Sequence, residues 1–139
     1  MKVATRPKPV IDIGAVDFSC AFCVCDVTQP DLPIVYCSEG FEKLTGYTEA
    51  EIMGQNCRFL QTPGGKMKPG RPNHDADSKI LQDLRRDISR RVETQHSILN
   101  YRKDGTRFQN LVTMIPVAWD SPDIRYYVGF QADAGTLGH

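Results

Sequence analysis

The hydrophobic pattern divides the chain into a β-rich start, a helical middle and a β-rich end. Residues 18–27 and 34–37 are short apolar stretches rich in β-prone side chains, and the turn-forming stretch 28–31 separates them. Short apolar runs bounded by turn residues are typical of buried strands. The first third of the chain therefore predicts a β-hairpin.

Two short helices are predicted next, because each begins with a capping residue. Ser38 can cap a helix that carries Phe41 and ends at Gly46. Thr48 and Glu51 have the spacing of a capping box, in which each side chain bonds to the backbone of the other residue. This part of the chain is expected to be a run of short helices rather than one long helix.

A longer helix is predicted from Asp77 or Ser78 to about Arg91, because apolar residues recur there at helical spacing. The apolar stripe consists of Ile80, Leu81, Leu84, Ile88 and Val92. Arg85 lies at the edge of this stripe, where it can extend to solvent or point into a cavity. The proline- and glycine-rich stretch 62–75 before the helix predicts a long loop, which is either a ligand cover or a spacer.

The last third of the chain predicts three strands, at residues 94–102, 107–117 and 124–133. Asp104-Gly105 joins the first two, and this dipeptide is the strongest short hairpin signal. Together with the N-terminal hairpin, these strands predict an α+β fold with a five-stranded antiparallel sheet and short helices on one face. The order of the strands does not follow from the pattern.

The length of 139 residues suits one domain with a single core. We expect an N-terminal arm at residues 1–14, the domain at 15–133 and a tail at 134–139. Lys plus Arg and Asp plus Glu both number 17, so no net charge favours nucleic acid or a membrane surface. No apolar run approaches the roughly 20 residues that span a bilayer, and no signal peptide is evident. We therefore expect neither a nucleic-acid nor a membrane partner, and a location in the nucleus or cytoplasm.

Five cysteines form no regular disulfide framework, which indicates free thiols in a reducing compartment. Cys23 and Cys25 point to the same face of a strand. No second cysteine pair stands at the spacing of a zinc site. We therefore expect no metal site and interpret these two residues as small core side chains.

Residues 54–61 place a thiol, two amides and a guanidinium beside Phe59 and Leu60. On helical spacing, Cys57 and Gln61 lie one turn apart on the same face, with Arg58 next to it. We interpret this stretch as one wall of a pocket for a flat, partly apolar ligand with an anionic end. The alternative is a short surface helix around a buried structural cysteine.

Three amides lie in the predicted sheet, at Asn100, Asn110 and Gln131. Amides carry both donors and acceptors, so together they could bind the edge of a planar heterocycle. Asn100 and Asn110 lie on opposite arms of the Asp-Gly hairpin and can come close across it. The alternative is that all three face solvent.

Taken together, these residues resemble LOV domains, the blue-light-sensing flavin branch of the PAS fold, and among them the fungal White Collar and Vivid-type receptors. The resemblance extends over about residues 15–133. The residues that carry it are 54–61, 100–105, 108–110 and 129–131.

The resemblance implies a flavin cofactor, FAD or FMN, and a role for each candidate residue. Cys57 would form a reversible bond to carbon C4a of the flavin after absorption of blue light. Gln131 would contact N5 and O4 and relay the change to the sheet. The other cofactor-binding residues would be Arg58 and Arg85 at the phosphate, Asn56 and Gln61 at the ribityl chain or ring edge, and Asn100 and Asn110 at the pyrimidine end.

The same resemblance implies a photoreceptor module rather than an enzyme. Light would change association with a second copy or with another LOV or PAS protein, in transcription or clock control. Cys23 and Ile34 would tune the lifetime of the adduct, and Cys20 resembles a hinge cysteine or is a core residue. A light-independent flavin-binding PAS module, for redox sensing or protein interaction, is the alternative.

Overall fold

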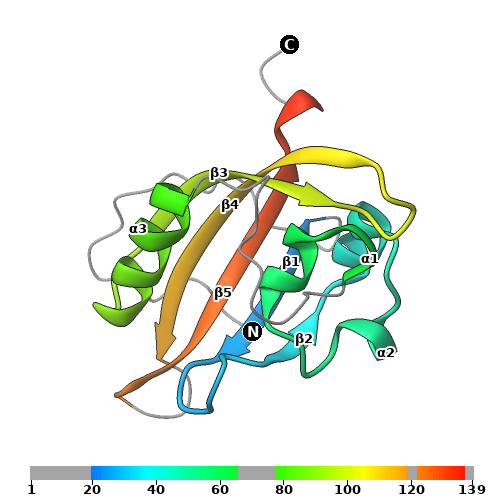
Figure 1. The fold of residues 1–139 in the computed structure, drawn as a ribbon. Coiled ribbons are helices and arrows are strands. Elements are labelled where there is room, and N and C mark those ends of the chain that lie inside the picture. Colours follow the sequence, from blue (N-terminus) through cyan, green and yellow to red (C-terminus); the bar gives the residue numbers. More distant parts are fainter. Residues whose placement is uncertain (1–19, 66–77, 119–121, 137–139) are drawn as a thin grey trace.

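Five strands form one antiparallel sheet in the structure, a computed structural model that describes residues 20–65, 78–118 and 122–136 (Figure 1). The sheet order is β2-β1-β5-β4-β3. Strand β5 is central, with β1 and β4 as its hydrogen-bonded neighbours. The strands are β1 (Ala21–Asp26), β2 (Ile34–Cys37), β3 (Thr94–Tyr101), β4 (Arg107–Ala118) and β5 (Ile124–Asp133). The predicted α+β class and five-stranded sheet are confirmed. The strand order also shows that β1 and β5, the first and last strands, lie side by side.

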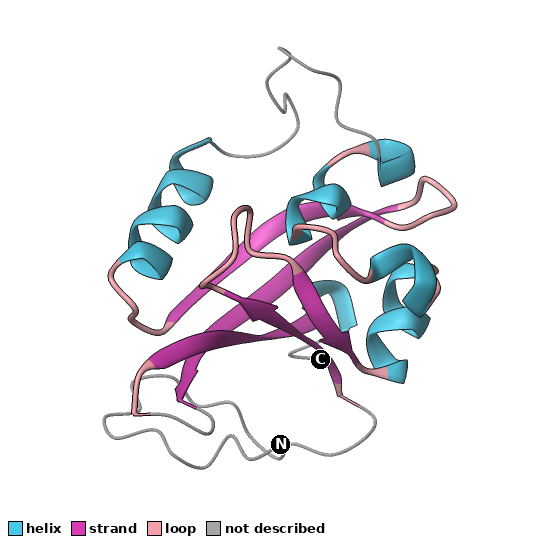
Figure 2. Ribbon diagram, turned by 90° about the horizontal axis from the view of Figure 1, so that it is seen from below, coloured by secondary structure: helices cyan, strands magenta, loops and turns pink. Residues whose placement is uncertain are grey.

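The helices between the hairpin and the last three strands cover one face of this sheet (Figure 2). Helix α3 stands apart from the cluster of α1, α2 and η1, so the face between them is flanked on two sides. The helical elements are α1 (Glu39–Thr45), α2 (Glu49–Ile52), η1 (Cys57–Gln61), η2 (Pro63–Gly65), α3 (Ser78–Ser89) and η3 (Ala134–Thr136), of which the η elements are 3₁₀ helices.

Both predicted helix caps are present. The Ser38 hydroxyl accepts a hydrogen bond from the backbone N–H of Phe41 at 3.1 Å. Gly46 ends α1 with a φ of 81°, in the left-handed region that glycine tolerates best. Thr48 and Glu51 form the expected capping box at the start of α2. These local bonds fix where the chain turns towards η1.

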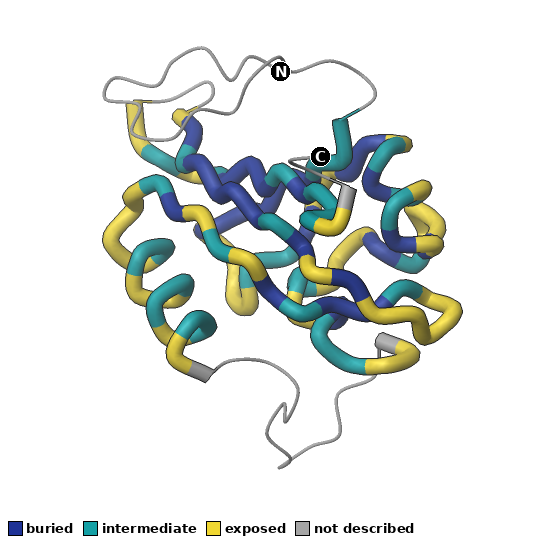
Figure 3. The backbone as a smooth tube through the Cα atoms, turned by 90° about the horizontal axis from the view of Figure 1, so that it is seen from above, coloured by how far each residue is buried: buried dark blue, intermediate teal, exposed yellow. Residues whose placement is uncertain are grey.

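Strand alternation gives the sheet two different faces. The outer face buries Val24, Val117 and Val128, and Phe22 packs on Phe130 with ring centroids 5.9 Å apart. The face under the helices carries the thiols of β1 and the amides of the later strands. Burial is concentrated along the central strands, whereas the outer sides of the helices are exposed (Figure 3).

Some boundaries differ from the sequence-based predictions. Helix α3 ends at Ser89, and Val92 is 44% exposed instead of completing the apolar stripe. Strand β1 is Ala21–Asp26, and Phe18 and Ser19 of the predicted strand lie outside the described residues. The expected arm at 1–14 lies outside the described residues, as do residues 66–75 of the predicted loop, the cap at Asp77 and residues 137–139.

Candidate functional site

A cavity of about 670 Å³ lies between the sheet and the helices. Its walls are mostly apolar and come from η1, α3 and four of the strands. This volume is within the usual range of small-molecule and cofactor sites, about 300–1,000 Å³. Seven of the eight residues predicted to bind the cofactor or react with it line this cavity: Asn56, Cys57, Arg58, Gln61, Arg85, Asn100 and Gln131.

The eighth predicted residue, Asn110, lies behind the cavity wall and is fully buried. Its Nδ2 donates to Asn100 Oδ1 at 2.8 Å and to Gln131 Oε1 at 2.6 Å. Its Oδ1 accepts from the backbone N–H of Ala132 at 3.2 Å. Asn110 therefore holds the two amides that reach the cavity, and all three face the helices rather than solvent.

The register of the sheet explains this contact. Asn100 is the Cα partner of Phe108, and Asn110 is the partner of Ile98. The two asparagines are therefore diagonal neighbours on one face, a distance that side chains of this length can span. Their predicted proximity is confirmed, in a diagonal rather than a directly opposed arrangement.

The stretch predicted as a helix around Cys57 is a 3₁₀ helix, η1. With three residues per turn, Cys57 lies above Leu60, and Gln61 is rotated to one side. The prediction that Cys57 and Gln61 share one helical face is therefore wrong, because it assumed α-helical spacing. Both side chains still line the cavity.

Asn56 starts η1 and ties it to the turn before β2. Its Oδ1 accepts from the backbone N–H of Arg58 at 2.9 Å, and its Nδ2 donates to the backbone carbonyl of Asp31 at 2.7 Å. Nη2 of Arg58 lies 2.6 Å from the carboxylate of Asp31. An exposed ion pair of this kind contributes only about 0–1 kcal/mol, so an anionic group at the rim could replace the carboxylate at little cost.

Three thiols meet beside the cavity. The sulfur of Cys57 lies 3.6 Å from that of Cys23 and 3.8 Å from that of Cys25. The pKa of Cys57 is well below its ordinary value, because its sulfur can accept hydrogen bonds from the Cys23 and Cys25 thiols. The pKa of Cys23 is raised by its hydrogen bonds with the Cys25 and Cys57 thiols and by burial. The resemblance assigned a tuning role to Cys23, whereas Cys25, which lines the cavity, was interpreted only as a core side chain.

The other two residues predicted to tune the site occupy different positions. Ile34 is 1% exposed and belongs to the same core cluster as Cys23, against which Cys57 packs. Cys20 precedes β1, and its backbone carbonyl accepts from the Ser38 hydroxyl at 2.9 Å. None of the five cysteines forms a disulfide.

Gly129 is a further site residue, to which neither the sequence pattern nor the resemblance assigned a role. A β-carbon at this position would lie 2.8 Å from Sδ of Met114 and 3.1 Å from Nε2 of Gln131. A contact below 3.0 Å would force the methionine to move. The glycine therefore leaves room for two cavity residues, which only the pairing of β5 with β1 and β4 reveals.

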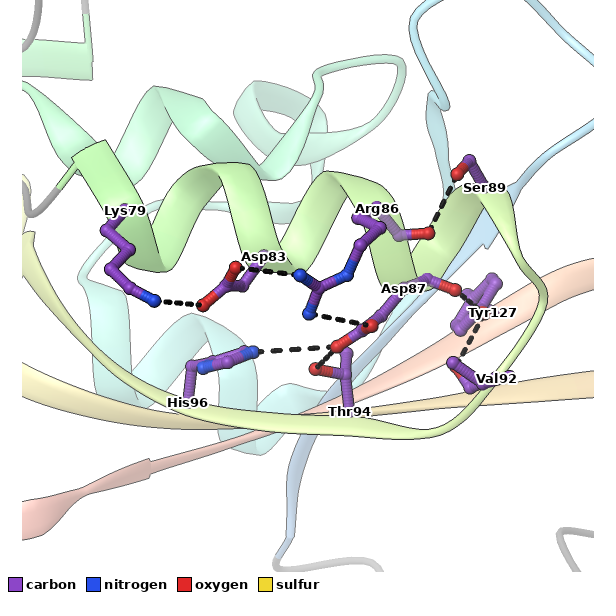
Figure 4. Close-up of polar contacts among 9 residues, drawn as sticks. All are labelled: Lys79, Asp83, Arg86, Asp87, Ser89, Val92, Thr94, His96 and Tyr127. Carbon is purple, nitrogen blue, oxygen red and sulfur yellow. Dashed lines mark hydrogen bonds and ion pairs between the residues drawn. The ribbon is translucent and has the colours of Figure 1, made fainter.

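A polar cluster fixes the C-terminal half of α3 to the sheet (Figure 4). The Tyr127 hydroxyl of β5 donates to the carbonyl of Val92 at 2.7 Å, and Thr94 donates to the carboxylate of Asp87 at 2.8 Å. The bond from Thr94 keeps the pKa of Asp87 below its usual range. This attachment positions the cavity-lining residues of the helix, which are Leu81, Leu84, Arg85 and Ile88.

The residues present fit a flavin. Buried amides form one end of the cavity, aliphatic side chains form its walls, and the exposed Arg58 and Arg85 lie at its rim. A flat heterocycle with an anionic tail requires amides at one end of its cavity and cations at the other, since amides pair with ring edges and guanidinium groups pair with phosphate.

Comparison with known proteins identifies the family of the chain. Residues 19–134 match the PAS domain family. The chain is 56% identical over 132 residues to the blue light receptor lreA of Aspergillus flavus and 50% identical over 131 residues to the White collar 1 protein of Neurospora crassa. These matches cover 95% and 94% of the chain but only 15% and 11% of the two relatives.

Two solved structures resemble the fold of this chain along most of their length. The light-state dimer of the fungal blue-light photoreceptor Vivid is 45% identical, with a TM-score of 0.86 and coverage of 93% of this chain and 87% of that one. A fungal LOV domain photoreceptor described in relation to blue light and oxidative stress is 46% identical, with a TM-score of 0.80 and coverage of 94% and 87%. Across the described residues, no helix has the length and apolar character that crossing a bilayer requires. The chain therefore belongs to the PAS domain family, in its branch of fungal LOV photoreceptor domains similar to those of White collar 1 and Vivid.

Proposed function

We propose that this chain is a blue-light sensor domain that binds a flavin in the cavity and changes its association with a partner on illumination. The observation that carries this proposal is the position of Cys57, whose thiol lines the same cavity as the buried amides. A domain that only bound flavin would have no use for a thiol there. The proposed location, the nucleus or cytoplasm, follows from the sequence expectations.

A bound flavin would supply the absorption of blue light and the ring carbon C4a, to which the sulfur of Cys57 would add reversibly while its thiol proton passes to N5. The neighbouring thiols of Cys23 and Cys25 orient this sulfur through their hydrogen bonds. Asn100 and Gln131 would bind the polar edge of the ring, and Asn110 holds both side chains in place. Arg58 and Arg85 would bind the phosphate end, and Asn56 and Gln61 would bind the ribityl chain or the ring edge.

Gln131 is the residue best placed to carry the signal. Its Oε1 accepts from Asn110, and its Nε2 donates to the backbone carbonyl of Gly129 at 3.2 Å. If its amide turned over, two N–H donors would face each other at Asn110, and that hydrogen bond would be lost. A change of protonation at the ring edge would therefore reach β4 through Asn110 and β5 directly.

The absorption spectrum tests the proposed function. The purified full chain is expected to be yellow, to lose its blue absorption band under blue light and to recover it in the dark. Flavin released by denaturation would then be identified as FAD or FMN by chromatography. A yellow protein whose band is unaffected by light would instead indicate the light-independent flavin module, and a colourless protein that takes up neither flavin would contradict both.

The Gln131→Leu substitution tests the relay. Blue light is expected to change the mass of the native protein measured by light scattering, in line with the light-state dimer known for Vivid. In Gln131→Leu the light-induced bleaching should persist, while the change in mass should fall to less than about half, because leucine cannot exchange donor for acceptor.

Gln95→Leu is the matched control. Gln95 is exposed on β3, and its side-chain amide also makes a hydrogen bond to a neighbouring strand, donating to the Thr113 hydroxyl at 2.9 Å. This variant should respond to light as the parent does. A full mass change in Gln131→Leu would rule out the relay.

A further inference from the structure

The three thiols beside the cavity form a cluster whose geometry suits more than one function. All three sulfur atoms, of Cys23, Cys25 and Cys57, lie within 4.8 Å of one another. Cys23 and Cys25 reach the cluster from the same face of β1, and Cys57 reaches it from η1. We propose that this cluster is a binding site for a soft monovalent metal ion of the Cu(I) class, held by three cysteine sulfurs.

The distances between the sulfurs carry this proposal. A metal with sulfur bonds of about 2.3 Å in a trigonal plane needs sulfurs about 4.0 Å apart. Cys57 lies 3.6 Å and 3.8 Å from its two neighbours. The sulfurs of Cys23 and Cys25 lie within 4.8 Å of each other, so small shifts of the three side chains would bring all the sulfurs to this spacing.

The type and number of ligands select the metal. Soft thiolate ligands favour Cu(I), whereas structural zinc takes four ligands. Among the residues that the structure describes, no histidine, aspartate or glutamate joins this cluster. Three cysteine sulfurs, with no fourth cysteine, histidine or carboxylate in the cluster among the described residues, suit a trigonal Cu(I) ion better than a tetrahedral zinc ion. The expectation of no metal site was based only on the spacing of cysteines along the sequence. In the fold, Cys57 comes from a distant segment and provides the third sulfur.

The surroundings of the cluster support binding. Cys25 and Cys57 line the cavity, whereas Cys23 is fully buried and does not. Nε2 of Gln131 lies 3.7 Å from the sulfur of Cys23 and can donate a hydrogen bond to it. Donors of this kind orient and stabilise metal-bound ligands.

Metal binding would have a consequence for light sensing that rests on the proposed function. A sulfur of Cys57 held by the metal is not available to bond with the flavin. The metal-loaded protein would therefore keep its yellow colour but lose its response to light, and a Cu(I) chelator would restore the response.

The experiment is an anaerobic titration of the full chain, purified with its flavin, using Cu(I) in competition with a coloured Cu(I) indicator. We expect one tightly bound equivalent, with X-ray absorption showing three sulfur neighbours at about 2.3 Å. Cys23→Ser and Cys25→Ser should each weaken binding at least tenfold. Folding of each variant is checked by circular dichroism and by its flavin content.

Cys37→Ala is the matched control. Cys37 is a buried thiol of β2 and the Cα partner of Cys23, but it lies outside the cluster. Its removal should leave the affinity unchanged. The metal site is excluded if Cys23→Ser and Cys25→Ser bind Cu(I) as tightly as the parent, or if Cys37→Ala weakens binding equally.

The bleaching assay separates this proposal from the proposed function. If the metal-free protein fails to bleach, the proposed sensor function is wrong. The number of Cu(I) ions bound per chain and the number of sulfur neighbours of the ion still test the metal site. If the metal-free protein bleaches and the loaded protein bleaches equally, the bound ion does not hold Cys57 and the three-sulfur site is wrong.

Discussion

Replacing Cys57 with alanine is expected to abolish reversible bleaching while the protein remains yellow. The side chain is small, only partly buried and at the edge of a core cluster, so its loss removes little packing. The amides and arginines of the site are untouched, so flavin should remain bound. The measurement compares the blue absorption band before illumination, under light and during recovery in the dark.

Cys37→Ala serves as the control for the loss of a buried thiol. Burial raises the pKa of Cys37 to about 11, and the residue does not line the cavity. This variant should bleach and recover as the parent does. A reversible bleach that survives in Cys57→Ala would contradict the assignment and would point to Cys25, which also lines the cavity.

Replacing Asn110 with leucine should weaken flavin binding at least about tenfold, even though Asn110 does not line the cavity. The substitution removes the donor that holds Asn100 and Gln131 at 2.8 Å and 2.6 Å. Each buried polar group left without a partner costs about 1–3 kcal/mol, and 1.4 kcal/mol is tenfold in affinity. Flavin titration followed by fluorescence gives the affinity, and urea unfolding of the flavin-free protein gives the change in stability.

Gln109→Leu provides the comparison, since Gln109 is the neighbouring residue on β4 and is exposed on the opposite face, where it bonds Ser97 at 3.0 Å. Its effect on stability should stay within about 0.5 kcal/mol. If Asn110→Leu destabilised the flavin-free protein but bound flavin with unchanged affinity, Asn110 would be a residue of the core alone and not a positioning residue of the site.

Features determined by neighbouring residues could be predicted from the sequence. The Ser38 cap, the Thr48 capping box and the Asp104-Gly105 turn each depend on a few adjacent residues, and the structure has all three. The five strands and their antiparallel arrangement also followed from short-range patterns.

Features that depend on distant segments could not be predicted. The pairing of β1 with β5 joins residues at least 100 positions apart, and no local pattern specifies it. That pairing places Gly129 beside Cys23, and the packing of η1 against β1 brings Cys57 to Cys25. The 3₁₀ geometry of η1 was missed for a different reason: the spacing of apolar residues over five positions does not distinguish three residues per turn from 3.6.

The position of Gln131 beside the start of β1 has a consequence for the use of this domain as a component. Ala21 is the Cα partner of Gln131, two residues before β5 ends at Asp133. The first and last strands of the described core therefore meet at the same end of the sheet, next to the relay residue. A core spliced into a loop of a host protein through these two ends would span a short gap, as a loop insertion requires. A light-driven change at Gln131 would then occur directly beside the two splice points.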